Sequence, residues 1–289
     1  MLKKKIAPYL YIIPGLLILL IFVYYPIFRN IEYSFLKWDL FSGTKKFVKF
    51  TNYLSLFRSD EFGVAFKNNI LYIIISFIFQ VGISVIFASI LENMKYKKLS
   101  TLFRTTFFLP SLISLTIIGL LFTFIYKTDG LLNSILEVMH LGDFTKGWLG
   151  DEKTAIFSII AVSQWKSTGY TMMLFIVAIQ KIPTEINEAA KIDGATRLKT
   201  FLHITIPLIK DMIKISTIIT ISGGLLVFNE IFIMTNGGPY GSSEVLSTIM
   251  YKNAFVHGNI GYASAIANVI LLLSFVFSAL QFITKESDN

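Results

Sequence analysis

The sequence predicts an all-α, polytopic membrane protein with six transmembrane helices. Hydrophobic residues make up 54% of the 289 residues, and the mean hydropathy is +0.66. Charged residues make up only 15% of the chain, well below the roughly 25% usual for soluble domains. So few polar residues cannot cover the surface of a water-soluble protein of this length, and lipid is therefore the expected solvent.

Apolar residues continue far enough to cross a bilayer in six places. The predicted spans are residues 9–28, 69–91, 105–126, 155–179, 213–234 and 263–283. Because consecutive spans cross in opposite directions, an even number of spans puts both termini on the same side. The expected transmembrane domain is therefore 9–283, between terminal tails of residues 1–8 and 284–289.

The distribution of Lys and Arg predicts which side carries the termini. Over all loops the two sides differ little, because the long first outer segment, 29–67, contains several cations. Long loops have little influence on orientation, and the later outer loops contain few cations, whereas the inner loops 92–104 and 181–214 are basic. Both termini are therefore expected in the cytoplasm. The net charge of +8 fits basic loops held against an anionic leaflet.

Other protein classes are not supported by the composition. No basic stripe with interleaved exposed aromatic residues is present, so nucleic-acid binding is not expected. The absence of cysteine excludes disulfides and thiolate sites. His140, His203 and His257 fall in three separate loops and predict no metal site. The basic N-terminus resembles a signal peptide, but the residues 24–26, Tyr-Tyr-Pro, offer no small-residue cleavage site, so an uncleaved first span is expected.

The loops and one proline add local expectations. Aromatic residues punctuate the segment 29–67, which is expected to fold against the membrane surface. Pro110 lies near the start of the third span, where a kink is tolerated if the surroundings are packed with protein. Residues 235–239, Thr-Asn-Gly-Gly-Pro, form a strong turn signal after the fifth span.

A polar island, residues 183–207, separates the fourth and fifth spans. Pro183 and Thr184 predict a helix start with Thr184 as the cap, and Gly194 predicts its end in a conformation with positive φ. Thr196 should cap a second short helix, and Pro207 introduces the next span. Periodicity alone favours an ordinary interfacial helix between two spans. The spacing of particular residues indicates something more specific.

Glu188-Ala189-Ala190 is followed after three residues by Gly194, and after nine more by Ile204 and then Ile206-Pro207. This spacing resembles the EAA loop of the permease subunits of bacterial ATP-binding-cassette importers. That pattern usually has Leu before the proline, and Ile206 is a conservative replacement. The stretch from residue 227 to the Gly-Gly-Pro at 237–239, together with 180–183 and 251–265, is similar to sugar permeases of the maltose/glycerol-phosphate class, on the side of the larger maltose subunit.

The resemblance implies a fold, a mechanism and partners. It implies the type I importer permease fold in a bacterial cell membrane, in the common six-span form without the extra spans of the larger maltose subunit. The EAA segment would be a coupling helix that sits in a cleft of a cytoplasmic ATPase dimer. The other implied partners are a second permease subunit and an extracellular sugar-binding protein. The chain itself would need no cofactor, because the ATPase binds ATP and magnesium, and it would not be an enzyme. The implied coupling residues are Glu188, Ala189, Ala190, Asp193, Gly194 and Pro207.

The substrate path is predicted from polar groups inside the spans, which are functional candidates by default. The resemblance matches Tyr170 and Ser167 to sugar-contacting positions of the maltose relative. The fifth-span wall, residues 220–227, lacks the amides of that relative, so the identity of the sugar does not carry over. The candidate path residues are Gln164, Trp165, Ser167, Tyr170, Gly224, Val227, Asn229 and Glu230.

Alternative functions remain open from the sequence. A permease of the same superfamily for peptides, phosphate or polyamines would have the same island, and the Gly-Gly-Pro exit argues against it. A polytopic enzyme would need converging catalytic groups, which the sequence does not show. No phosphate-binding loop is present, so ATP hydrolysis by this chain is not expected. A passive channel would leave the EAA spacing without a purpose. The sequence identifies neither the sugar, the host nor the partner chains.

Overall fold

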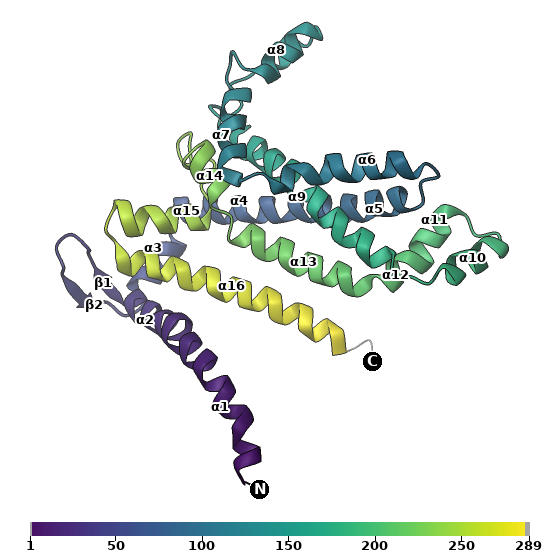
Figure 1. Ribbon diagram of the computed structural model, residues 1–289. Helices are drawn as coiled ribbons and strands as arrows, with labels where there is room; N and C mark the ends of the chain where they lie inside the picture. The colour runs from purple at the N-terminus through teal and green to yellow at the C-terminus, as the bar shows by residue number, and fades with distance from the viewer. Residues whose placement is uncertain (1, 287–289) are drawn as a thin grey trace. The chain divides into compact units, whose positions relative to one another are not determined.

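The computed structural model describes the backbone of residues 2–286 and the side chains of residues 11–279. The predicted tails, 1–8 and 284–289, therefore fall outside the described side chains. Apart from one short hairpin, the described chain is helical (Figure 1). The elements are α1 Leu2–Leu19, η1 Leu20–Tyr24, α2 Tyr25–Ser34, β1 Leu36–Trp38, β2 Lys45–Phe47, α3 Thr51–Phe57, α4 Asp60–Ser76, η2 Phe77–Ile83, α5 Ser84–Glu92, α6 Lys97–Phe108, η3 Leu109–Leu112, α7 Leu115–Ile125, α8 Leu131–Val138, η4 Gly142–Phe144, α9 Ala155–Ile179, α10 Thr184–Ile192, α11 Arg197–Thr200, η5 Phe201–Thr205, α12 Ile206–Leu208, α13 Lys210–Leu225, α14 Asn229–Met234, α15 Leu246–Tyr251, η6 Lys252–Val256 and α16 Ile260–Glu286.

The chain divides into two compact units. The first combines the residues up to Phe62 with Ile249–Leu272, and the second combines Gly63–Thr248 with the residues from Leu273 onward. The first unit begins with the continuous helix α1-η1-α2. Its β1–β2 hairpin pairs antiparallel, with Leu36 opposite Phe47. The segment 29–67 is therefore folded, with this hairpin followed by α3, and its expected place against the membrane surface stays a prediction.

Amide and hydroxyl groups link the helices of the first unit. The Asn30 side-chain amide donates to the Asn268 side-chain oxygen at 2.7 Å, and Asn268 donates in turn to the Tyr53 hydroxyl at 3.1 Å. The Tyr53 hydroxyl donates to Ser34 at 2.8 Å. Such bonds hold membrane helices together because lipid offers polar groups no alternative partner.

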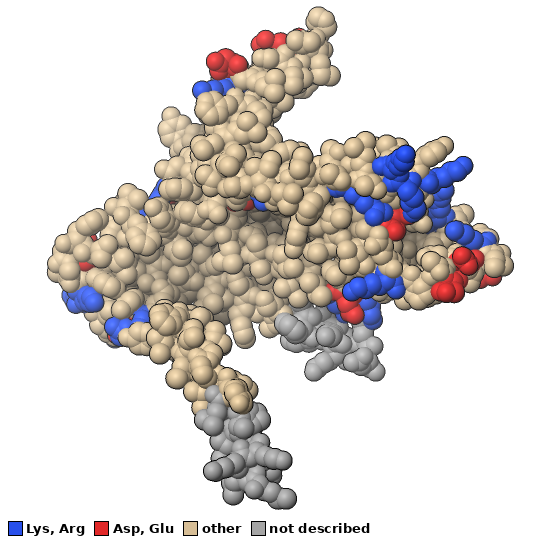
Figure 2. Space-filling view, in the orientation of Figure 1, with Lys and Arg blue, Asp and Glu red and all other residues tan. Residues whose placement is uncertain are grey.

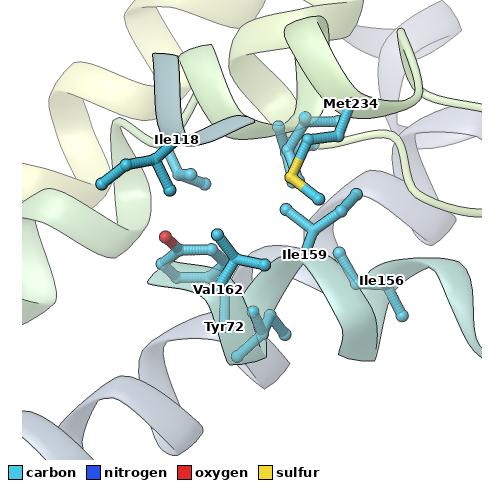
Figure 3. Packing of buried hydrophobic residues seen from close by; sticks show 10 residues of the cluster. Tyr72, Ile118, Ile156, Ile159, Val162 and Met234 are labelled. Atoms are coloured by element: carbon cyan, nitrogen blue, oxygen red, sulfur yellow. The ribbon is translucent and has the colours of Figure 1, made fainter. Parts of the chain in front are cut away.

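Helix α9 is the centre of the second unit and contacts α5, α6, α7, α13 and α14. Two apolar clusters surround it. One cluster joins Tyr72 of α4, Ile118 of α7, Ile159 of α9 and Met234 of α14 (Figure 3). The other joins Val85 of α5 to the far end of α9, including Phe175. The fourth span is thus enclosed by protein over most of its length.

The third predicted span is sharply bent rather than a single helix. Helix α6 with η3 meets α7 at 98°, and Ile113 and Ser114 form the extended break. Pro110 lies within η3, three residues before the extended Ile113, so the kink that the sequence allows in this span is present. Proline cannot donate a backbone hydrogen bond, and the helix is interrupted there.

The fifth predicted span is also interrupted. Helix α13 ends at Leu225, and α14 begins only at Asn229. The fully buried Asn69 donates to the carbonyls of Gly224 at 2.7 Å and Leu225 at 3.3 Å, and its oxygen accepts from the backbone of Leu246 at 2.8 Å. A broken membrane helix exposes backbone groups that must find partners inside the protein, and Asn69 provides them.

Three described helices are long and apolar enough to cross a membrane, and the bent pair α6–η3 with α7 makes a fourth. The three are within Tyr11–Ser34, Asp60–Glu92 and Ile260–Ala279. Helix α9 has the predicted bounds, 155–179, but polar residues occupy its middle. Helix α13 has only 16 residues because of the break at Leu225. All six predicted segments therefore contain helical structure, with the fourth interrupted by polar residues and the fifth by the break after Leu225.

Two π-helical turns precede prolines at the same spacing. The turn Leu20–Tyr24 is followed by Pro26, and the turn Phe201–Thr205 by Pro207. A proline ring collides with the carbonyl one turn earlier in a regular α-helix, and a wider turn relieves this collision. Past Pro26 the chain continues as α2, whereas past Pro207 the short helix α12 ends at Leu208 and α13 begins at Lys210.

Candidate functional site

The first half of the polar island is helix α10. It starts at Thr184, but its cap residue is Pro183 and no side chain caps it, so the prediction that Thr184 caps the helix is wrong. Glu188, Ala189 and Asp193 are exposed, whereas Ala190 is only 6% exposed. Helix α10 and its C-cap Asp193 therefore present the carboxylates of Glu185, Glu188 and Asp193 and the methyl group of Ala189 outward, and the helix packs inward through Ala190.

Gly194 ends α10 as predicted, with φ of +73°. The backbone amides of Asp193 and Ala195 donate to the carbonyls of Ala189 and Ala190, both at 2.9 Å. These bonds satisfy carbonyls that the end of the helix leaves unpaired. Residues with a side chain are strained at this φ, so glycine permits the tight turn between the two halves of the island.

The second half of the island runs through α11, η5 and α12. Thr196 caps it as predicted, because its hydroxyl accepts from the Lys199 backbone amide at 3.3 Å. His203 lies within η5, in the connection between the fourth and fifth predicted spans. Pro207 lies exposed in α12 and directly precedes α13. We call residues 183–207 the coupling segment from here on, after the role that the sequence resemblance implies for them.

Buried isoleucines fix both ends of the coupling segment to the second unit. Ile182 is 9% exposed and Ile209 is 3% exposed, and both belong to the apolar cluster that contains Val85 and Phe175. Phe201, inside the segment, packs against the same cluster. A displacement of the segment would therefore be transmitted directly to α5 and α9.

A polar link reinforces this attachment. The Gln180 amide, just after α9, donates to both oxygens of Glu92 at 3.3 and 3.2 Å. Glu92 also forms an ion pair with Arg104 of α6. The ends of α5, α6 and α9 thus meet next to the coupling segment.

Charge gathers at this end of the second unit. Figure 2 shows basic atoms over the α5–α6 turn and the neighbouring coupling segment, with acidic atoms on α10. The basic residues of these two elements are Lys95, Lys97, Lys98, Lys191, Arg197 and Lys199. Several apolar side chains of the segment are also exposed, with Ile192 at 86% and Leu198 at 66%. Exposed apolar groups rimmed by charge are typical of a protein or membrane contact surface.

The predicted path residues of α9 divide into buried and exposed groups. Gln164 is 3% exposed; its amide donates to Ser76 at 3.0 Å, and its oxygen accepts from Gln80 at 2.9 Å. Trp165 and Tyr170 are each 48% exposed, and Ser167 is half-buried. Trp165 packs against Phe122 with ring centroids 5.4 Å apart. Gln164 and Trp165 also line a mainly apolar cavity of about 410 Å³.

The predicted path residues of the fifth span are mostly buried. A side chain at Gly224 would collide with Ile73, and Val227 is 5% exposed within an apolar cluster. Asn229 is exposed, whereas Glu230 is half-buried and accepts hydrogen bonds from Tyr72 at 3.2 Å and Ser163 at 3.4 Å. The structure brings Glu230 together with α4 and α9 and leaves Asn229 apart.

Sequence reasoning missed Gln80, Asn68 and Asn69. Half-buried Gln80 lies in the π-helical η2 and also accepts from Thr220 at 3.5 Å. The Asn68 amide donates to the carbonyls of Ser242 and Glu244, each at 2.8 Å. The sequence did carry a signal that could have identified these three residues. They are amide side chains within or beside an apolar segment, and such groups need polar partners inside a membrane protein.

The structure thus combines apolar helices long enough to cross a membrane with an exposed helical segment between two of the predicted spans. The chain belongs to the family of binding-protein-dependent transport system inner membrane components, whose sequence model matches residues 84–285. It is therefore a component of a membrane transport system.

Individual relatives are similar over nearly their whole length. The probable ABC transporter permease protein YurN of Bacillus subtilis is 49% identical over 280 residues, which cover 96% of each chain. The lactose transport system permease protein LacF of Rhizobium radiobacter is 33% identical and covers 95% of this chain and 92% of its own. A chain of a bacterial alginate ABC transporter, solved in complex with an alginate pentasaccharide-bound periplasmic protein, superimposes with a TM-score of 0.84 at 24% identity, covering 96% and 93% of the two chains. This structural similarity establishes the importer permease fold.

Proposed function

We propose that this chain is one of two permease subunits of an ATP-driven sugar importer. It forms half of the translocation path and is coupled to a separate cytoplasmic ATPase through residues 183–207. The observation that carries the proposal is the coupling segment: its carboxylates face outward, while buried Ile182 and Ile209 fix both ends to the cluster around α5 and α9. A partner that binds the exposed face can thereby move the spans.

Coupling between the ATPase and the permease is thermodynamic linkage between ATP binding and the conformation of the spans. ATP can shift the permease between inward-facing and outward-facing states only through contacts that differ between those states. Glu188 would pair with a cation of the ATPase, Ala189 would permit close approach, and Gly194 would set the bend. ATP and magnesium belong to the ATPase, and the chain itself acts as a permease rather than as an enzyme.

The partners and orientation follow from the same architecture. A second permease subunit completes the path, and an extracellular binding protein delivers the cargo. The basic α5–α6 turn and coupling segment lie on the cytoplasmic side, as the positive-inside rule requires. The relatives named for lactose and alginate transport support a sugar as cargo. Exposed Trp165 and Tyr170 are suitable side chains for stacking against sugar rings.

The test is reconstitution of the full transporter in proteoliposomes. The chain is combined with the second permease, the ATPase and the binding protein, and uptake of a panel of labelled solutes is measured. We expect uptake of a sugar that requires both ATP and the binding protein. Uptake of a peptide, phosphate or polyamine instead would reject the sugar assignment while keeping the coupling, and transport by the purified chain alone would reject both.

A further inference from the structure

A groove of about 510 Å³ lies between the end of α5 and the second half of the coupling segment. Its apolar part is lined by Ile86, Ile90 and Met94 on α5 and the turn after it, and by Leu198 and Phe201. Ile86 and Ile90 are 46% and 54% exposed, so they are open to whatever surrounds the protein. Met94 and Phe201 pack against the apolar cluster around α5 and α9, so the groove lies between that cluster and the exterior.

The other end of the groove is polar and positively charged. Exposed Lys95 and Arg197 line it from opposite sides, one after α5 and one in α11. A smaller cavity of about 130 Å³ shares Ser89, Asn93, Arg197 and Phe201 with the groove and adds Lys191. Among the described residues that line the two cavities, none is acidic.

A groove with apolar side chains at one end and cations at the other matches one class of ligand. Ile86 and Ile90 belong to the apolar helical segment 60–92. Lys95 comes shortly after the end of this segment, and Arg197 of α11 lines the same groove. The groove therefore crosses from hydrocarbon depth to headgroup depth, with cations only at the headgroup end. We propose that it binds an anionic phospholipid, with an acyl chain along Ile86 and Ile90 and the headgroup phosphate between Lys95 and Arg197.

Because of where the groove lies, a bound lipid would affect the transporter. The groove joins α5 directly to the coupling segment, so an occupied groove would hold these two elements together. The inference uses the membrane orientation of the proposed function but neither its cargo nor its ATPase. Lipid binding can therefore be measured on the purified full-length chain, and its failure would leave the transport proposal intact.

The experiment is native mass spectrometry of the full chain in mild detergent with dioleoyl-phosphatidylglycerol or dioleoyl-phosphatidylcholine. We expect the wild type to retain the anionic lipid in preference to the zwitterionic one. In the double variant Lys95→Gln/Arg197→Gln the preference for the anionic lipid should fall at least tenfold. Each cation near a headgroup contributes a factor of roughly five to this preference. The matched control Lys98→Gln/Lys199→Gln changes exposed cations of the same two elements that do not line the groove, and it should bind as the wild type does.

A steric variant tests the apolar part separately. Ile90→Trp should fill the groove and reduce retention of both lipids, whereas Ile74→Trp, at a site of similar exposure (52%) outside the groove, should not. Equal retention of the two lipids by the wild type, or unchanged retention after Lys95→Gln/Arg197→Gln, would overturn the proposal. So would displacement of the lipid by inorganic phosphate, which would indicate a soluble anion site, or disulfide cross-linking of two chains through Ile90→Cys, which would indicate an interface.

Discussion

The coupling segment and the polar middle of α9 both interrupt apolar sequence, but they use their polar residues in opposite ways. In the coupling segment Glu188 and Asp193 are exposed, and the segment is held by buried Ala190 and by buried Ile182 and Ile209 at its two ends. In α9 the polar Gln164 is enclosed, and both ends of its amide have partners on the second span. The comparison teaches that polarity in a membrane protein marks either a partner-binding surface or a helix–helix contact, and burial distinguishes the two.

The largest loss of folding stability is expected where α9 packs against α6. Any side chain at Gly169 would collide with the backbone carbonyl of Phe107, so the two helices would have to separate. Gly169→Val should therefore lower the free energy of unfolding by about 1–3 kcal/mol or more. Thermal unfolding and size-exclusion chromatography in detergent measure this loss. Gly82→Ala, where the added atom meets nothing within 4 Å, is the matched control, and equal behaviour of both variants would contradict the packing argument.

The opposite behaviour is expected in the coupling segment. Glu188→Lys reverses an exposed charge, so the unfolding temperature should stay unchanged, while ATP-driven uptake in the reconstituted transporter should fall at least tenfold. The physical reason is the lost pairing with the ATPase, since removing one partner of an interface charge pair typically costs about 2–5 kcal/mol. Asp211→Lys, another exposed carboxylate outside the segment, should transport normally. Normal uptake by Glu188→Lys at normal expression would defeat the coupling role.

Within α9, substitutions at two adjacent residues should have different effects, one on folding stability and the other on transport. Gln164→Leu leaves the Gln80 amide and Ser76 hydroxyl without their partner, and a buried unsatisfied group costs about 1–3 kcal/mol. Trp165→Leu, at a side chain that is 48% exposed, should leave the unfolding temperature nearly unchanged and raise the KM for uptake. Detergent unfolding and uptake kinetics on the same preparations decide this. If Gln164→Leu is as stable as the wild type, the inferred helix–helix role is wrong.

The sequence predicted the helical segments and the turn at Gly194 because those depend on local composition and spacing. It placed the start of the fourth helix at residue 155 and its end at 179, as the structure does. It missed the interruption at Leu225, because that break depends on Asn69, which lies 155 residues away from Gly224 in sequence. It also treated Gln164 and Trp165 alike, since adjacent residues on a helix point to different surroundings and only the packed structure shows which is buried.

The sequence could not identify the groove at Lys95 and Arg197 for the same reason. Each residue reads as one more cation in a basic loop, and the positive-inside rule already accounts for such residues. Their relation appears only when the end of α5 and α11 line one cavity. The sequence therefore shows the charge and type of each residue, whereas only the folded structure shows which residues far apart in sequence line the same groove.

The smallest effect is expected at Gly194, and it tests whether the coupling segment is independent of the packed helices. The backbone there has φ of +73°, and an added side-chain carbon would meet nothing within 4 Å. Gly194→Ala should therefore cost roughly 1 kcal/mol through backbone strain alone, and Gly194→Asn less, because asparagine tolerates the left-handed conformation. Hydrogen exchange at the Asp193 and Ala195 amides should be faster in Gly194→Ala than in Gly194→Asn, while exchange in α9 stays unchanged. Faster exchange throughout α9 would mean that the segment and the core unfold together, and the contrast between the two regions would fail.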